Sequence, residues 1–109
     1  MRKYSIYQIE SDAPAARYIK FSDLEFVKEH NLCTMEGDMC KLDSDLYKKV
    51  YEGEVEDEGV EATLDTLFVK FQGRKPEGYT GHSLSVSDVI VLDGTAYYVD
   101  GYGFEKIDF

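Results

Sequence analysis

The residues with the clearest chemical potential form one short run, in which His82 is followed by three serines and an aspartate. A serine nucleophile needs a base within hydrogen-bond reach and a carboxylate that orients the base. Ser83, Ser85, Ser87 and Asp88 complete those residue types. The spacing from Ser85 to Asp88 is also that of a capping box, which binds the backbone amides of one turn. We therefore expect a structural loop with no catalytic residue, and keep a ligand-binding loop as the alternative.

A metal site is the second chemistry to consider. His30, Cys33 and Cys40 could bind zinc if Asp38 or Glu36 supplied a fourth ligand. The chain lacks the paired Cys-x-x-Cys spacing of common zinc sites. We expect no metal and no cofactor. The two cysteines are too few for a disulfide scaffold and are expected to be reduced thiols that pack as small apolar side chains.

Charge gives the strongest pattern in the chain. Positions 51 to 66 hold seven carboxylates and no basic residue. They are Glu52, Glu54, Glu56, Asp57, Glu58, Glu61 and Asp65. In a strand, alternate residues lie on one face about 6.6–6.8 Å apart, close to the intrastrand phosphate spacing of DNA. The run is either a solvated loop or a surface for a basic partner, and its first five carboxylates are partner-binding candidates.

Aromatic residues are the second source of partner-binding candidates. The chain has nine tyrosines and six phenylalanines, but no basic groove beside which they could stack nucleic-acid bases. Tyr97, Tyr98 and Tyr102 cluster near the C-terminus, where strand alternation should bury some and expose others. Exposed tyrosines are typical of protein interfaces, so we include these three as candidates.

Length and composition limit the class of protein. With 109 residues, 43% hydrophobic and 31% charged, the chain is expected to form one globular domain over residues 1–109. Its formal net charge of −10 opposes direct binding to nucleic acid. It has neither a signal-peptide pattern nor an apolar run of the roughly 20 residues that span a bilayer. We expect a cytoplasmic protein with no membrane contact.

Hydrophobic periodicity predicts an α+β fold. Ser22 has the position of a helix N-cap with Glu25 as its capping-box partner, and Asn31 is suited to ending that helix. Leu32 to Asp45 has no clear period and is expected to be a loop, with a short strand or turn as an option near Met39 to Leu42. The expected elements are strands at 4–9 and 46–55, helices at 23–30 and from 60 to a Gly73 cap, and strands at 89–92, 96–99 and 104–109. They predict a mostly antiparallel sheet of about five strands with two helices packed on it and a C-terminal β-hairpin.

Several segments resemble the YodL-like domain family. The clearest is GHSLSVSDVIVL at residues 81–92, followed by YYVD at 97–100 and GF at 103–104. YSIYQ at 4–8, VYEGE at 50–54 and LDTLF at 64–68 extend the resemblance over most of the chain. The resemblance implies a domain of Firmicutes-type bacteria, often carried on conjugative elements, with no agreed activity and no catalytic residues to transfer.

Together these features predict a non-catalytic protein-interaction module in an accessory protein of a bacterial mobile element. Its partner is a protein, basic if the acidic run is the contact, and the domain itself is a monomer or weak homodimer. The alternative is an acidic DNA mimic that inhibits a nucleic-acid-binding defence enzyme of the restriction or CRISPR type.

Overall fold

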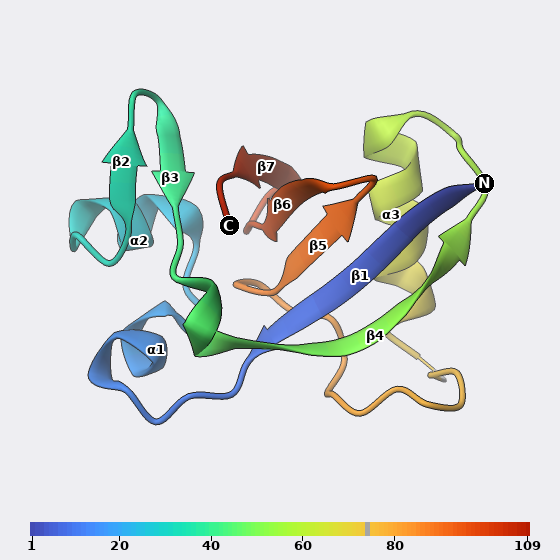
Figure 1. Cartoon of the computed structure of the whole chain (residues 1–109), viewed down its shortest axis with the longest axis horizontal. Coiled ribbons are helices and arrows are strands. Elements are labelled where there is room, and N and C mark those ends of the chain that lie inside the picture. The colour runs from blue at the N-terminus through green and yellow to red at the C-terminus, as the bar shows by residue number, and fades with distance from the viewer. Residues whose placement is uncertain (74) are drawn as a thin grey trace.

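The computed structural model describes residues 1–73 and 75–109 and has the predicted α+β architecture (Figure 1). The described residues form two sheets and three α-helices. In chain order the elements are β1 (Arg2–Ile9), α1 (Pro14–Ile19), α2 (Leu24–Glu29), β2 (Thr34–Glu36), β3 (Met39–Lys41), a 3₁₀ turn (Ser44–Leu46), β4 (Tyr47–Val55), α3 (Val60–Lys70), β5 (Val89–Leu92), β6 (Thr95–Val99) and β7 (Phe104–Ile107).

The main sheet has five strands in the order β4-β1-β5-β6-β7, and every neighbouring pair is antiparallel. The predicted hairpin joins β5 to β6 through Asp93 (φ 49°) and Gly94 (φ 82°), a left-handed pair that suits a tight two-residue turn. The register between β1 and β4 shifts between Ile6 and Tyr7, because Val50 has no partner there.

Helices lie on both faces of the main sheet. One face packs against α3 through a core that includes Ile6, Leu64 and Phe71. The other face packs against α1, α2 and the β2–β3 hairpin through a core that includes Ile19 and Tyr98. In Figure 1 these elements lie on the left of the view and α3 lies on the right behind β1. None of the described helices is long and apolar enough to cross a membrane.

The helix ends differ from the expected ones by one or two residues. Asp23, not Ser22, caps α2, since its carboxylate accepts the Phe26 amide at 2.8 Å. The Ser22 hydroxyl instead donates to the carbonyl of Tyr18. Asn31 does adopt the left-handed conformation after α2 (φ 54°). The last helix ends at Lys70 with Phe71 as its C-cap, so Gly73 does not cap it.

The helix α1 and the strand β2 were not predicted, whereas β3 lies where a short strand was kept as an option. Residues 14–19 form α1, because Pro14 occupies the first helical position, where its missing amide hydrogen costs nothing. Between residues 34 and 41, β2 and β3 form a small hairpin around Gly37 (φ 65°). The hairpin is attached to the main sheet by the bridge between Lys41 and Asp108. Part of the region expected to be a loop therefore forms a second small sheet, which is joined to the chain just after β7.

Candidate functional site

The loop from Gly81 to Asp88 is organised around the buried side chain of Gln8. The Gln8 amide nitrogen donates to the Asp88 carboxylate at 3.0 Å and to the carbonyl of His82 at 2.9 Å. Its oxygen accepts the His82 amide at 3.1 Å. The same Asp88 oxygen accepts the Ser85 amide at 2.8 Å, which is the acidic half of the predicted capping box. The loop is thus fixed to β1 by a buried polar network.

The three serine hydroxyls of this loop each bind a backbone group. Ser83 donates to the carbonyl of Gln72, Ser85 donates to the carbonyl of Ser83, and Ser87 accepts the amide of Phe21 at 2.9 Å. Among the described residues, none of these hydroxyls is hydrogen-bonded to His82. The base–nucleophile contact that serine chemistry requires is therefore not assembled in this loop.

Burial dominates the electrostatics of Asp88. The residue is 1% exposed, and this desolvation raises the pKa of its carboxyl group from 3.8 to about 6. The amide of Ser85, the Gln8 side chain and the charges of His82 and Lys20 pull the pKa the other way. The Asp88 carboxyl group is thus buried and accepts hydrogen bonds from the Gln8 side chain and the Ser85 amide.

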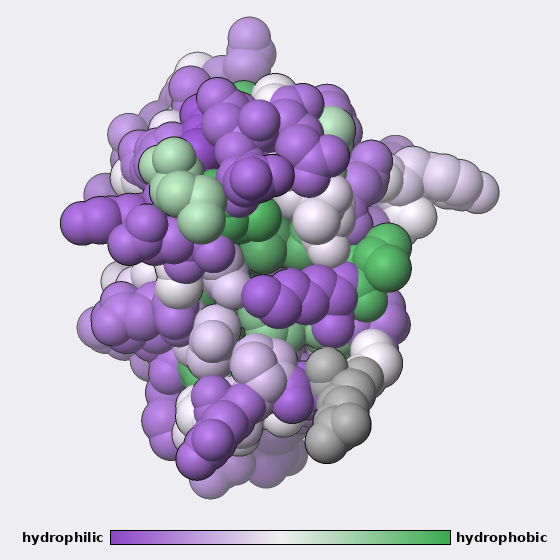
Figure 2. Space-filling view, turned by 90° about the vertical axis from the view of Figure 1, so that its right-hand side faces the viewer, coloured by the Kyte–Doolittle hydropathy of each residue, from purple (hydrophilic) through white to green (hydrophobic). Residues whose placement is uncertain are grey.

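The acidic candidates lie at the end of β4 and in the loop before α3. Glu52 pairs with Lys49 at 3.0 Å and Asp57 pairs with Arg2 at 3.3 Å. Glu58 accepts the hydroxyl of Thr66 at 3.2 Å. All five candidate carboxylates, Glu52, Glu54, Glu56, Asp57 and Glu58, belong to exposed residues. Figure 2 shows that the end of the molecule with α3 and the end of β4 is mainly hydrophilic.

The three tyrosine candidates are not part of one surface. Tyr102 is 99% exposed, whereas Tyr97 is partly buried in the core beneath α3. Tyr98 is completely buried on the opposite face, and its hydroxyl donates to the carbonyl of Ser22 at 2.6 Å. The structure therefore corrects the prediction for Tyr98, which is a core residue and is not available to a partner.

We expect Tyr98→Phe to lower the free energy of unfolding by about 1 kcal/mol, because it removes one buried hydrogen bond. Tyr102→Phe is the matched control and should leave stability unchanged, since its ring is solvated. Chemical denaturation measures the free energy of unfolding of both variants. Equal stability of Tyr98→Phe and the unchanged chain would contradict the assigned role of the hydroxyl.

The residues considered for a metal site make other contacts. The His30 ring stacks on Phe26 with ring centroids 4.0 Å apart. Cys33 and Cys40 form a disulfide, so the expectation of two reduced thiols is wrong for this structure. Sequence spacing could not reveal the bond, because the pairing of β3 with β2, a strand that was not predicted, brings the two cysteines together. The described residues contain no cluster of three or more metal-ligating side chains.

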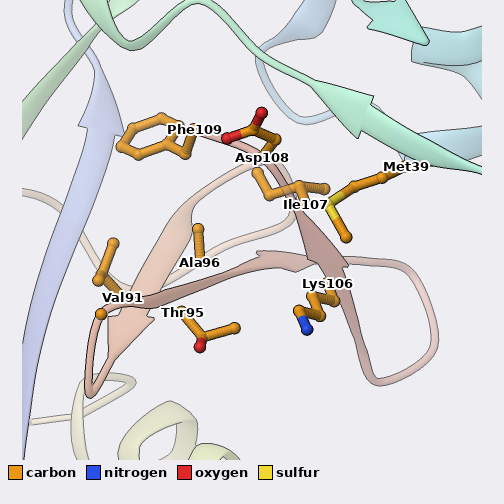
Figure 3. A pocket seen from close by; sticks show the side chains of 9 residues that line it. Met39, Val91, Thr95, Ala96, Lys106, Ile107, Asp108 and Phe109 are labelled. Carbon is orange, nitrogen blue, oxygen red and sulfur yellow. The ribbon is translucent and has the colours of Figure 1, made fainter. Parts of the chain in front are cut away.

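A hollow of about 230 Å³ lies on the face of the main sheet opposite α3 (Figure 3). Its floor is formed by Val91 of β5 and Ala96 of β6, and Ile107 of β7 closes one side. Met39 of β3 and Phe109 stand over it as walls in Figure 3. Its apolar side chains suit an aliphatic or aromatic group, and Thr95, Lys106 and Asp108 add polar and charged groups to the lining.

The strand registers place this hollow in one row with the acidic candidate Glu52. Across the sheet, Glu52 lies opposite Ser5, and Ser5 lies opposite Val91. The row continues from Val91 to Ala96 and then to Ile107. Directly opposed residues of antiparallel strands share a face. We call this row, from Glu52 to Ile107, the cross-strand row.

The end of this sheet face at Glu52 is not covered by the helices. Lys3, Glu52 and Glu54 are exposed, and Ser5 and Val91 are partly exposed. Lys3 and Glu54 form the next row, since they are paired in register on the same face. The uncovered surface therefore changes from apolar at the hollow to charged at β4.

The sequence pattern indicates Glu52 but not the hollow. Met39 and Phe109 reach Val91 only because β3 is bound to the C-terminal segment, where the Asp108 amide donates to the carbonyl of Cys40 at 2.9 Å. The small residue at position 96 in an otherwise aromatic and β-branched strand was the one available signal. A second apolar slot, between α1 and α2, was also not predicted; it is lined by Tyr18, Phe26, His30 and Leu32.

These features define a small α+β domain whose polar loop is held to β1 by buried hydrogen bonds and whose accessible hollow lies on an antiparallel sheet. The YodL-like domain family matches residues 3–109, and the chain belongs to that family. No curated protein and no solved structure matches the chain.

Proposed function

We propose that this domain is a non-catalytic protein-interaction module that binds an extended segment of a partner along the cross-strand row. One observation carries the proposal: the apolar floor of the hollow, Val91 and Ala96, lies in the same row of one sheet face as the exposed Glu52. An apolar side chain of the partner would enter the hollow. A basic side chain would contact Glu52 and Glu54.

The charge of the chain supports a basic partner. With a net charge of −10, the domain attracts cationic segments over the range set by ionic screening. Glu52 is already paired with Lys49, but both side chains are about half exposed or more. Such surface pairs contribute only about 0–1 kcal/mol, so a partner's arginine can replace Lys49 at little cost.

Strand geometry gives the expected spacing in the partner. Val91 and Ala96 lie two and three strands away from Glu52, which corresponds to about 10–14 Å. In an extended peptide, residues four positions apart lie on the same side and are about 13 Å from each other. The preferred ligand should therefore carry a large apolar residue and an arginine or lysine four positions apart.

The edges of the sheet favour a domain that does not polymerise through its strands. The outer strand β4 presents Lys48, Lys49, Glu52 and Glu54, and β7 presents Glu105 and Lys106. Charged edge strands oppose pairing with another sheet. These features support the proposal of a monomer or weak homodimer. The proposed location is the cytoplasm, as the sequence led us to expect, and the family resemblance supports an origin on a bacterial mobile element.

Mimicry of DNA is the second candidate function. The exposed Glu52 and Glu54 on one face of β4 favour it, since they form a short row of carboxylates. Against it, Lys3 and Lys49 lie on the same face and interrupt the negative charge, and Arg2 pairs with Asp57 of the acidic run. A mimic would bind a basic DNA-contacting surface without any need for the apolar hollow.

A randomised ten-residue peptide library tests the proposal. We expect selected peptides to share the apolar–basic spacing of four and to bind Val91→Trp at least tenfold more weakly, because the indole fills the hollow. Glu52→Lys should weaken binding by a similar factor. Asp65→Lys makes the same charge change on α3, across the sheet, and should alter affinity less than twofold. Fluorescence anisotropy at fixed ionic strength measures the affinity of a selected peptide for the unchanged chain and for each of the three variants.

The two candidate functions give different outcomes. Binding that Val91→Trp leaves unchanged and Glu52→Lys abolishes would overturn the row proposal in favour of mimicry. Equal effects of Glu52→Lys and Asp65→Lys would show that only the net charge matters and would also contradict the proposed site.

A further inference from the structure

The Cys33–Cys40 disulfide joins the segment that follows α2 to β3, across the base of a hairpin whose two strands also pair in register. Cys33 follows α2, and Cys40 lies in β3, with their Cα atoms 6.0 Å apart. The two cysteines enclose β2 and the turn at Gly37. The bond therefore closes a short loop that contains most of the small hairpin.

The hairpin makes limited contact with the rest of the domain. All three residues of β2 are exposed. On β3, the backbone of Cys40 accepts the amide of Asp108, and Leu42 just after β3 donates to the carbonyl of Asp108, both at 2.9 Å. The ion pair between Lys41 and Glu36 lies within the hairpin itself. The hairpin is therefore held to the sheet by this backbone junction and the buried Cys40 and Leu42 side chains, and the disulfide ties it to the segment that follows α2.

Each cysteine is next to a residue that lines an apolar surface. Met39, beside Cys40, is a wall of the hollow in the cross-strand row (Figure 3). Leu32, beside Cys33, lines the slot between α1 and α2. The covalent bond therefore links the two segments that carry these walls.

We propose that the Cys33–Cys40 bond is a thiol–disulfide exchange site that acts as a reducible latch on the β2–β3 hairpin. In the oxidised form the latch holds Met39 over the hollow. In the reduced form the hairpin moves away from the sheet and the hollow loses that wall. The effect on ligand affinity rests on the proposed function, whereas the latch itself does not.

The accessibility of the two sulfur atoms determines which of them a reductant attacks. Cys33 is partly exposed and Cys40 is 1% exposed. The thiolate of a dithiol reductant would therefore attack Sγ of Cys33, and the leaving Sγ of Cys40 would take up a proton. The second thiol of the reductant then attacks the mixed disulfide, releases Cys33 as a thiol and leaves the reductant as a disulfide. Two electrons and two protons pass from the dithiol to the protein.

Hydrogen exchange of the full chain, with and without dithiothreitol, tests the latch. We expect reduction to speed amide exchange of residues 34–42 at least tenfold and to leave β1 and β5 unchanged. Intact mass after alkylation counts the thiols: none before reduction and two after it. In the Cys40→Ser variant, oxidised glutathione should form a mixed disulfide at Cys33, whereas Cys33→Ser should react at least tenfold more slowly at the buried Cys40.

Two results would overturn the proposal: alkylation of both cysteines in folded protein prepared without a reductant, or identical exchange of residues 34–42 before and after reduction. Faster exchange in β1 and β5 as well would indicate general destabilisation and also reject a local latch. A selected peptide should bind the reduced chain at least threefold more weakly. Because exchange and mass need no peptide, failure of the binding proposal does not affect the latch test.

Discussion

Replacing Gln8 by leucine is expected to lower the free energy of unfolding by about 3–5 kcal/mol. The side-chain nitrogen of Gln8 donates to the Asp88 carboxylate and to the carbonyl of His82, and its side-chain oxygen accepts the backbone amide of His82. Leucine has a similar volume but no polar atoms, so these buried groups would lose their partner without a cavity forming. An unsatisfied buried group costs about 1–3 kcal/mol, and a charged one costs more. Urea denaturation at pH 7 measures the change.

Tyr79→Phe is the matched control for this network. Its hydroxyl donates to the carbonyl of His82 at 2.7 Å and accepts from Gln8 at 3.2 Å, but it lies nearer the surface. We expect a cost of about 1 kcal/mol, because water can satisfy the carbonyl in the variant. Similar losses for Gln8→Leu and Tyr79→Phe would show that the buried amide does not organise the loop.

The close approach of Gly81 to Gln8 explains why this loop has a glycine. A Cβ at position 81 would lie 2.9 Å from Cδ of Gln8 and 3.1 Å from Cβ of Val50. The backbone of the loop can thus reach the Gln8 amide only without a side chain there. Gly81 and Gln8 are 73 positions apart in the chain, so no local pattern could connect them.

The elements predicted correctly are those with strong local signals. Asp93-Gly94 identified the hairpin, and the apolar stripe at Leu64, Leu67 and Phe71 identified α3. These signals are local because a turn conformation and a helical face are each set by residues close in sequence. The five-stranded antiparallel sheet followed from them.

The candidate site could be predicted only in part, because it depends on contacts between distant segments. Glu52 was visible as part of an acidic run. Its alignment with Val91 depends on the β1 strand lying between β4 and β5, and on the register of both pairs. A shift of one residue would turn Glu52 to the other face. The hollow also needs Met39, which belongs to a hairpin of three-residue strands too short for a periodic signal.

Asp88→Asn is expected to make the protein more stable at pH 7, by about 3 kcal/mol, and to leave it nearly unchanged at pH 4. Burial raises the pKa of the Asp88 carboxyl group to about 6 in the folded chain, against 3.8 for a solvated carboxyl group. The folded state therefore binds a proton more tightly than the unfolded state. Each pKa unit corresponds to 1.36 kcal/mol, which gives the size of the effect.

The sign of this pH dependence follows from the two pKa values. Below pH 3.8 the group is protonated in both states, and its contribution to stability is complete. As the pH rises through about 6, the folded chain must hold a buried charge, and the contribution is lost. Asparagine can keep an oxygen where Asp88 accepts the Ser85 amide and the Gln8 side chain, so the donors stay satisfied. Urea denaturation of both proteins at pH 4, 5, 6 and 7 should give curves that separate above pH 4, and parallel curves would mean that Asp88 carries no buried charge at neutral pH.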